Sequence, residues 1–390
     1  MTRRRISITE DQALAFRARR GHLLGPGAKD AVTAARDILG AQSQQLGTSL
    51  FALCQRTRKR PTHAQLEQLL FGEGVPLVRT WGQRDTIHVY DAAAHWRKIV
   101  AARGQWSQSG RRGAYPPDAL VRKTLKFLRE ELQQPAARKD IQHLVSKAYL
   151  KECIDKMQTD KGALPFAAGR ILWMLANQGE TRLGVKLGAE QTSVVRDHWH
   201  PDVPWPELDA EAANVALVEQ TLRLHAPMTV QDIAHFWGAN ISKARVWLER
   251  LEEHQELLDV DCGGRKGLLA LASDRAALKK KAPAETACPV RLLPQWDTLL
   301  MGHADKSWTV PREDERKSVW KIAAVVAPVV MARGRIVATW SHKRRAKVVD
   351  ITVQPLSGWR KSKHLKNVVA EAETVAAFYG RAEAKIVLAS

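Results

Sequence analysis

The stretch Pro227-Met228-Thr229-Val230-Gln231-Asp232-Ile233 decides the fold, because it starts a helix within an ordered series of helices and strands. Thr229 followed three residues later by Asp232 is typical of a helix N-terminus. A helix over 211–224 is expected before it and another over 242–254 after it. Residues 257–260 and 268–271 are apolar runs on either side of two glycines, which predicts a tight β-hairpin. Helices followed by such a hairpin form the outline of a winged helix-turn-helix unit.

The same order of elements occurs twice earlier in the chain. The capping box Thr9-Glu10-Asp11-Gln12 predicts a helix over 10–22 at the N-terminus. In this first unit, further helices are expected at 31–39, 47–57 and 62–70, and strands at 77–81 and 86–90. In the second unit, helices are expected at 118–133, 138–150 and 165–176, and a hairpin over 179–195. Three units of similar outline form an internal array.

The pattern changes after Pro289. Residues 333–340 and 348–353 alternate as strands do, and a basic tip at 342–347 separates them. A helix over 370–379 and a strand over 386–388 complete a small β-rich domain. The expected fold is therefore α+β, mainly α, with three tandem winged helix-turn-helix units and a β-rich C-terminal domain. The expected boundaries are 1–116, 117–205 and 206–274 for the three units and 275–390 for the C-terminal domain.

The distribution of charge indicates the class of partner. The formal net charge of the 390 residues is +20. Residues 1–116 carry +11, residues 117–274 carry −3, and residues 275–390 carry +12. Basic ends around a near-neutral middle predict that both ends bind a polyanion, and nucleic acid is the polyanion expected here. Charge that serves solubility alone is usually smaller and more evenly mixed.

Composition argues against several other classes of protein. No apolar stretch is long enough to cross a bilayer, and no apolar segment follows the basic start Met1-Thr2-Arg3-Arg4-Arg5. The four cysteines lie far apart, which argues against a zinc ribbon and fits reduced thiols. His198 and His200 lack the cysteine or carboxylate neighbours that would complete a metal site. We therefore expect a cytoplasmic protein with no metal, no cofactor and no membrane partner.

The segment Gly40-Ala41-Gln42-Ser43-Gln44 places amide side chains between two apolar runs. Such amides either have buried partners or are available to contact a ligand. Gln42 and Gln44 point the same way only on an extended segment, since on a helix they would diverge by about 200°. The second interpretation therefore requires the preceding helix to end near Gly40, a residue typical of helix ends. The alternative is that both glutamines satisfy backbone groups between the helices.

Several segments of this chain occur in the order found in one known family. They are the motif at 40–44, residues 77–81 with 84–88, residues 292–297 with 300–305, and residues 334–340. No single segment is specific, but the ordered set is, and it resembles the bacterial AlkZ-like DNA glycosylases over nearly the whole chain. The resemblance implies a C-shaped clamp of three tandem winged helices and a β-rich C-terminal element.

The resemblance also implies an activity, the hydrolysis of the N-glycosidic bond of alkylated purines. Expected substrates are N7-alkylguanine monoadducts and interstrand crosslinks. N7 alkylation makes guanine cationic, so the base leaves readily and needs little acid catalysis. By resemblance, Gln42 and Gln44 are the catalytic residues, and their neutral amides position the water. No lysine lies at the motif to form a Schiff base with the sugar, so a monofunctional enzyme is expected.

The partner implied is double-stranded DNA containing alkylated purines, bound by a monomer associated with the bacterial nucleoid. The expected DNA-binding residues are Arg79, Arg84, Thr86, His88, His303, Lys306, Arg312, Lys343, Arg344, Arg345 and Lys347. Two positions differ from the family pattern. Ser43 replaces the usual aliphatic residue of the motif, and Lys306 replaces a common arginine, which loses the bidentate geometry of a guanidinium.

The residues alone leave another class open, a non-catalytic winged-helix protein such as a transcription regulator. Regulators usually read DNA with a strongly basic recognition helix. In the third unit that helix mixes Lys243 and Arg245 with Glu249 and Glu252, and the second unit offers only Arg170. Neither helix favours a regulator. Binding of structured RNA is a third possibility that rests on charge alone.

Overall fold

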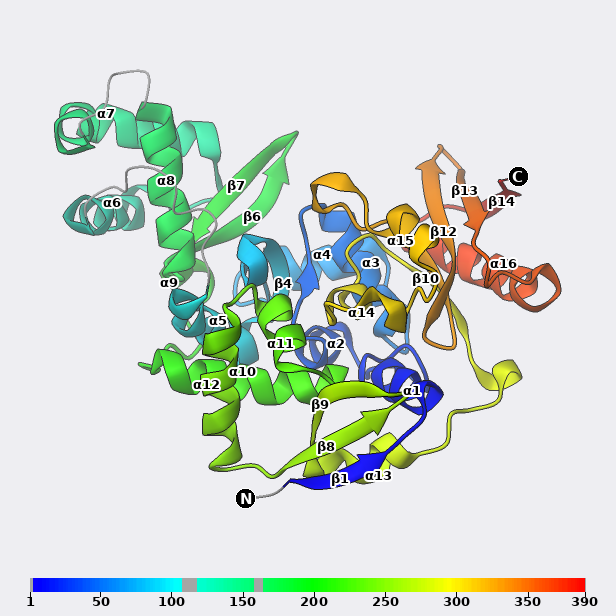
Figure 1. Ribbon diagram of the computed structural model, residues 1–390. Coiled ribbons are helices and arrows are strands. Elements are labelled where there is room, and N and C mark those ends of the chain that lie inside the picture. Colours follow the sequence, from blue (N-terminus) through cyan, green and yellow to red (C-terminus); the bar gives the residue numbers. More distant parts are fainter. Residues whose placement is uncertain (1–2, 107–117, 158–163, 390) are drawn as a thin grey trace.

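The computed structural model describes residues 3–106, 118–157 and 164–389 and shows a mixed α and β architecture (Figure 1). The helices are α1 (Glu10–Arg20), α2 (Ala31–Asp37), α3 (Leu46–Arg56), α4 (His63–Phe71), α5 (Arg97–Ala102), α6 (Asp118–Glu131), α7 (Arg138–Met157), α8 (Leu164–Asn177), α9 (Arg196–Trp199), α10 (Ala210–His225), α11 (Val230–Trp237), α12 (Ile241–Glu252), α13 (Arg275–Lys279), α14 (Thr298–Met301), α15 (Glu313–Val319) and α16 (Lys361–Phe378). The strands are β1 (Arg4–Ser7), β2 (Ala41–Gln42), β3 (Leu77–Trp81), β4 (Ile87–Asp91), β5 (Ala136–Ala137), β6 (Thr181–Leu187), β7 (Glu190–Val195), β8 (Leu257–Cys262), β9 (Arg265–Leu271), β10 (Val290–Leu293), β11 (Val329–Ala332), β12 (Arg335–Arg344), β13 (Val348–Pro355) and β14 (Glu383–Leu388).

The N-terminal elements follow the sequence pattern closely. Thr9 and Thr62 form capping boxes that satisfy free backbone N–H groups, so α1 and α4 begin where the sequence predicts. β3 and β4 form the predicted hairpin. The two-residue strand β2 then pairs with β4, which gives a sheet of order β2-β4-β3. This short strand, which no pattern predicts, brings Gln42 into the sheet.

The middle segment has a core of its own. Leu120, Leu128, Ile141 and Ile171 of α6, α7 and α8 are buried against one another. The hairpin β6–β7 and the short strand β5 form the adjoining sheet, in the order β5-β7-β6. Both β6 and α8 contact β3, so the middle segment lies directly beside the sheet that holds Gln42.

The third segment contains the predicted helices α10, α11 and α12 and the hairpin β8–β9, together with one strand from far away in the sequence. β1 pairs in parallel with β8, from Arg4 opposite Leu258 to Ser7 opposite Asp261. The sequence gives little sign of β1, because Ile6 is its one buried side chain. The N-terminal strand therefore completes a sheet formed about 250 residues later.

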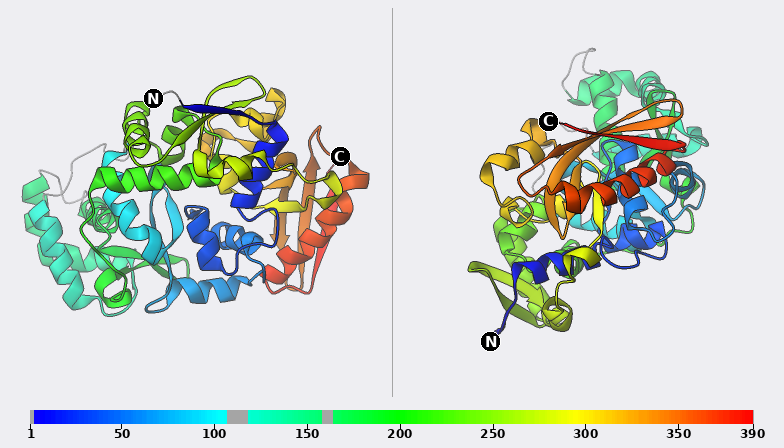
Figure 2. Two further views of the ribbon diagram at one scale, coloured as in Figure 1. Left: turned by 90° about the horizontal axis from the view of Figure 1, so that it is seen from below. Right: turned by 90° about the vertical axis from the view of Figure 1, so that its right-hand side faces the viewer.

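The C-terminal domain is built on a five-stranded sheet of order β10-β11-β12-β13-β14. Helix α16 packs across one face of this sheet (Figure 2). The expected helix over 370–379 was too short, since α16 begins at Lys361. Its first turns are mainly polar, with His364 and Val368 as the buried positions, so the apolar pattern marks only the later part.

Ionic contacts at Arg56 and Glu10 join the N-terminal helices to later parts of the chain. Arg56 of α3 forms a bidentate pair with Asp297, with both N–O distances 2.8 Å and both side chains fully buried. Glu10 of α1 binds Arg265 of β9 through one carboxylate oxygen at 3.1 Å and Arg335 of β12 through the other at 2.9 Å. The first helices thus connect the third segment with the C-terminal domain.

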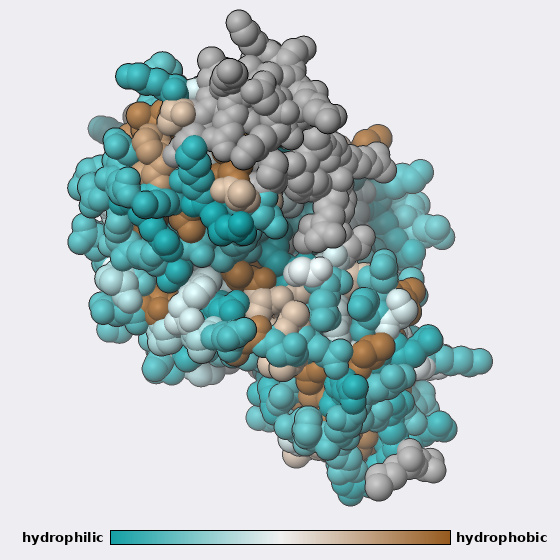
Figure 3. All heavy atoms as spheres, turned by 90° about the vertical axis from the view of Figure 1, so that its left-hand side faces the viewer, coloured by the Kyte–Doolittle hydropathy of each residue, from teal (hydrophilic) through white to brown (hydrophobic). Residues whose placement is uncertain are grey.

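The surface has no large apolar face in the view of Figure 3, where hydrophilic side chains predominate and apolar ones form small groups. The large apolar side chains that are exposed among the described residues are spread over several elements, with two of them on α12: Leu187, Ile241, Val246, Ile322, Val369 and Val387. In the part of the chain that the structure describes, no helix combines the length and hydropathy that a bilayer crossing requires.

Candidate active site

The helix before the glutamine motif ends before the motif begins. α2 stops at Asp37, and Leu39 and Gly40 then adopt positive φ angles of 57° and 86°. A Cβ atom at Gly40 would lie 2.4 Å from Cε1 of Tyr90, so both the backbone and the neighbouring ring require glycine here. The chain turns sharply and continues into β2. The extended geometry that the glutamine hypothesis requires is therefore present at Gln42.

Strand pairing places the motif residues on the two faces of the sheet. Gln42 lies opposite His88, and the backbone N–H of Ser43 donates to the carbonyl of Ile87 at 2.6 Å. Because side chains alternate along a strand, Gln42 and His88 share one face and Ser43 lies on the other. Gln42 is 8% exposed, whereas Gln44, beyond the last paired residue, is exposed.

Ser43 is fully buried, and its hydroxyl has polar partners. Its Oγ accepts a hydrogen bond from Arg79 Nε at 3.0 Å and another from Ser49 Oγ at 2.8 Å. Arg79 Nη2 also donates to the Ser43 carbonyl at 2.7 Å, and Nη1 donates to Gln191 of β7. At position 43, where the family resemblance implies an aliphatic anchor, this chain therefore has a buried serine held by hydrogen bonds.

These contacts change the interpretation of Arg79. The sequence predicts a DNA contact, but the side chain is 3% exposed and binds the motif backbone and the middle segment. Burial lowers the pKa of Arg79 to about 10, which leaves it charged at neutral pH. Arg79 supports the motif from behind rather than facing solvent. Sequence patterns could not reveal this, since Gln191 is 112 residues away.

Arg84 lies directly against Gln42. Its Nη2 donates to Gln42 Oε1 at 3.0 Å, and its Nη1 donates to the carbonyl of Phe236 in α11. Arg84 has a positive φ of 56° at the turn between β3 and β4. Removal from water lowers its pKa to about 10, so the guanidinium stays charged at neutral pH. Arg84 thus brings a fixed positive charge to the motif.

Thr86 and His88 are held by contacts within the same turn and strand. The Thr86 hydroxyl donates to the carbonyl of Gln83 at 3.0 Å. His88 is buried, stacks on Tyr90, and places Nδ1 3.1 Å from the Thr86 carbonyl. Burial, with the charge of Arg84 adding to it, holds the pKa of His88 well below its usual value. His88 is therefore neutral at physiological pH, and since a carbonyl only accepts, Nδ1 carries the proton.

His303 and Lys306 lie near α11 and have internal partners. His303 is buried, with Nε2 3.2 Å from the Pro227 carbonyl, so its expected place on a DNA-binding surface is wrong. Lys306 Nζ donates to the carbonyl of His303 at 2.6 Å and lies 3.3 Å from Nε2 of His235. Burial lowers the pKa of Lys306 to about 8. Through its bond to the His303 carbonyl, this ammonium group stabilises the loop that follows α14.

The remaining basic residues that the sequence predicts to bind DNA are exposed. Arg312 pairs with Asp314 at 2.7 Å. Lys343, Arg344, Arg345 and Lys347 all lie at the exposed tip between β12 and β13, where Arg345 also pairs with Asp350 at 2.6 Å. Arg344 lies over the ring of Tyr379 at 5.0 Å from its centroid. Within this group, the hairpin tip stays available for phosphate contacts.

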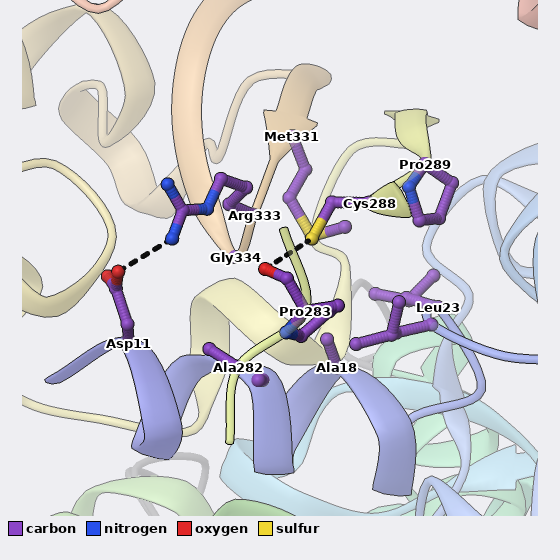
Figure 4. Close-up of a pocket in the computed structure, with 12 residues that line it drawn as sticks. Asp11, Ala18, Leu23, Ala282, Pro283, Cys288, Pro289, Met331, Arg333 and Gly334 are labelled. Carbon is purple, nitrogen blue, oxygen red and sulfur yellow. Dashed lines mark hydrogen bonds and ion pairs between the residues drawn. The ribbon is translucent and has the colours of Figure 1, made fainter. Parts of the chain in front are cut away.

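Hollows elsewhere in the molecule differ in what they could hold. The pocket of Figure 4, between α1, Cys288 and Met331, offers about 10 Å³, which is the lower limit for a single water molecule and too little for an organic ligand. A larger cavity of about 380 Å³ lies between the first and middle sheets and is lined by Trp81, Ile87 and Trp173 among others. Ile87 is also the residue whose carbonyl holds Ser43, so this cavity adjoins the motif from the face opposite Gln42.

Comparisons with known proteins agree with this geometry. A family model described as DNA glycosylase AlkZ-like matches residues 35–378. An interstrand DNA cross-link repair glycosylase of Streptomyces sahachiroi is 26% identical over 282 residues, which cover 68% of this chain and 70% of that protein. The solved structure of Streptomyces sahachiroi DNA glycosylase AlkZ has a TM-score of 0.80 at 20% identity, covering 98% of this chain and 100% of that one.

The last comparison concerns the fold, because the sequence identity is low. The family model carries the assignment, since it spans most of the chain and includes the glutamine motif, Arg84, His88 and the C-terminal strands. This chain belongs to the AlkZ-like DNA glycosylase family.

Proposed function

We propose that this protein is a DNA repair glycosylase that hydrolyses the N-glycosidic bond of alkylated, cationic purines. The proposed substrates are N7-alkylguanine monoadducts and interstrand crosslinks joined through such positions. The single observation that supports the proposal most is the end of α2 before the motif, which leaves Gln42 on the extended strand β2 and Gln44 exposed just beyond it. Family membership and the named relative, an interstrand cross-link repair glycosylase, support the same activity.

The chemistry suits neutral amides. In an N7-alkylguanine nucleotide, the C1′–N9 bond breaks and its electron pair goes to the cationic base, which leaves as a neutral molecule. A water oxygen bonds to C1′, and the proton of that water passes to solvent. Because the base is already activated, the enzyme has to position the water against the nucleotide without removing a proton fully. We propose that the amides of Gln42 and Gln44 provide this positioning and that no lyase step follows.

Selectivity follows from the same argument. Undamaged guanine is a poor leaving group, and hydrolysis of its bond requires an acid and a base that the motif lacks. Of the ionisable side chains beside Gln42, Arg84 stays charged and His88 stays neutral. Neither has a pKa near 7, where proton transfer is most efficient. The site therefore supports cleavage of cationic purines over intact ones.

Binding of duplex DNA is proposed for a monomer shaped as a clamp. Helices followed by hairpins occur three times, at β3–β4, β6–β7 and β8–β9, which supports three winged-helix units. The β12–β13 tip, with Lys343, Arg344 and Lys347, is the proposed phosphate-binding element of the C-terminal domain. Arg312 and Thr86 are proposed as further contacts. Family membership does not favour a non-catalytic regulator.

The proposal is tested with a duplex that contains one N7-methylguanine. Alkali cleaves the abasic site left after base release, so strand breaks measure the activity. Wild-type protein should produce breaks, and Gln42→Ala and Gln44→Ala should reduce them by about 100-fold or more, as loss of a catalytic hydrogen-bonding group does. A nitrogen-mustard crosslink serves as the second substrate. Equal product from wild type and both variants would contradict the catalytic assignment.

A further inference from the structure

The contact between Arg84 and Gln42 fixes which end of the glutamine amide faces which way. A guanidinium group has five N–H donors and no acceptor, so the Gln42 atom 3.0 Å from Arg84 Nη2 must be the carbonyl oxygen. The amide nitrogen then points away from Arg84. Among residues 3–106, 118–157 and 164–389, no hydrogen bond from this nitrogen is found. The amide N–H groups of Gln42 are therefore available to donate hydrogen bonds to a ligand bound at the site.

Arg84 is itself held in place by the third segment. Its Nη1 donates to the Phe236 carbonyl in the last turn of α11, and its guanidinium lies 5.7 Å from the centre of the Phe236 ring. Gly238, which ends α11 with a φ of 68°, approaches so closely that a Cβ there would lie 3.0 Å from the Arg84 Cα atom. A side chain fixed at both its backbone and its head group holds its partner in one orientation.

Gln44 has none of these restraints. It is exposed, and within the described ranges no side chain or backbone group binds its amide. Its carbonyl is free to accept a hydrogen bond from a water molecule. The two amides of the motif therefore differ in environment, since one lies beside a fixed cation and the other is open to solvent.

From this arrangement we propose that Arg84 is a positioning residue that makes the two glutamines unequal. Gln42 donates hydrogen bonds to the damaged nucleotide, and Gln44 accepts a hydrogen bond from the attacking water. This inference rests on the proposed glycosylase function and divides the positioning between the two amides.

Charge explains the division. A water molecule gains positive charge as its oxygen bonds to C1′, so it is best held by an acceptor that lies away from other cations. The carbonyl of Gln42 is next to the Arg84 guanidinium, which opposes that positive charge, whereas the exposed Gln44 carbonyl is bound by no cation of residues 3–106, 118–157 or 164–389. The departing purine gains electron density, and its N3 atom is a hydrogen-bond acceptor. A donor suits this atom, and Gln42 supplies one.

Two matched substitutions, Gln42→Glu and Gln44→Glu, test the inference on the N7-methylguanine duplex under single-turnover conditions. A glutamate has no donor, and at position 42 it would bind Arg84, so Gln42→Glu should lose about 100-fold in rate, as Gln42→Ala does. A glutamate at position 44 keeps the acceptor, so Gln44→Glu should stay within about tenfold of wild type. Equal rates for the two glutamate variants, whether high or low, would overturn the inference.

Thermal unfolding gives a readout that needs no activity. Gln42→Glu places a carboxylate against a buried guanidinium and should raise the unfolding midpoint by roughly 2 °C, whereas Gln44→Glu should leave it unchanged. An unchanged midpoint for Gln42→Glu would show that Arg84 does not hold this side chain. If wild-type protein releases no base, the proposed function fails, and this measurement still decides the orientation of Gln42.

A double-mutant cycle tests the role of Arg84 itself. Arg84→Gln should lower the single-turnover rate by about tenfold with little change in duplex affinity, because it acts through Gln42. In a Gln42→Ala background the same substitution should lower the rate no further. If the rate loss of the double variant equals the product of the two single losses, Arg84 has a structural role separate from Gln42, and the positioning role is contradicted. Circular dichroism of each variant confirms folding.

Discussion

Asp297→Ala should destabilise the protein strongly, because it leaves a buried guanidinium without its counter-ion. Arg56 and Asp297 are both fully buried, and the two hydrogen bonds between them are 2.8 Å long. After the substitution, the contact that remains to Arg56 among the described residues is its bond to the Ala52 carbonyl at 3.1 Å. Breaking a buried pair by removing one partner costs about 3–5 kcal/mol.

A second contribution comes from the helix that Asp297 caps. Its Oδ1 accepts from the Leu299 N–H at 3.0 Å, and losing such a cap costs about 1 kcal/mol. The expected total is therefore about 4–6 kcal/mol. With a urea dependence of roughly 2–3 kcal/mol per molar, the unfolding midpoint should fall by about 1.5–3 M.

The assay is urea unfolding followed by tryptophan fluorescence, with far-ultraviolet circular dichroism as a second probe that detects any separate transition. Asp314→Ala is the matched control, because Asp314 also pairs with an arginine but both side chains are more than half exposed. An ion pair this exposed contributes little to stability. The double substitution Arg56→Met with Asp297→Leu should recover much of the loss. A midpoint for Asp297→Ala within 0.3 M of the control, an interval of roughly 1 kcal/mol, would refute the reasoning.

Three further outcomes are expected. Gly40→Ala should lower the unfolding free energy by about 2–4 kcal/mol, because position 40 has a positive φ and the new Cβ would overlap Tyr90. Gly74→Ala, at a position with a positive φ but open space, should lower it by about 1 kcal/mol. Similar urea midpoints for the two variants would contradict this prediction. Alanine at the basic positions of the 342–347 tip should weaken duplex binding and reduce the salt dependence by about one unit per lost phosphate contact, measured by fluorescence anisotropy; an unchanged slope would exclude the tip from the interface. Burial holds the pKa of His225 at about 3, and His88 is also held low, so the unfolded state binds protons below pH 6.5 that the folded state does not. Stability should therefore fall as the pH drops from 6.5 to 5, by up to about 1.4 kcal/mol per pH unit for each histidine, and His225→Gln should reduce this slope in urea unfolding.

The sequence predicted those parts of the fold that local signals determine. The capping boxes at Thr9 and Thr62 set the starts of α1 and α4, and the strand expected over 77–81 coincides with β3. Strand β1 and the pairing of β2 with β4 escaped prediction, because both strands are short and depend on a partner distant in the sequence, β8 or β4. Local propensity contains no information about such distant partners.

In the candidate site too, the features set by local sequence were predicted and the features set by packing were not. The sequence correctly required the helix to end near Gly40, and the backbone is extended at Gln42, although Gln44 lies in a bend beyond the strand. It did not place Arg79 behind Ser43 or Arg84 against Gln42, because those contacts depend on how sheet and helices pack. His303 was misplaced for the same reason, since a polar residue after a glycine gives no sign of burial.

The contacts of α1 have a consequence for how the molecule moves. Glu10 bonds to Arg265 of β9 and to Arg335 of β12, and β1 is a strand of the same sheet as β9. Any hinge motion that separates the third segment from the C-terminal domain must therefore break a bond at Glu10 or bend the chain between β1 and α1. Strand β1 and helix α1 thus connect the third segment with the C-terminal domain. Their removal would delete these bonds and leave direct contacts, such as the hydrogen bond from the Ala304 N–H to Asp232 at 2.8 Å, to join the two parts.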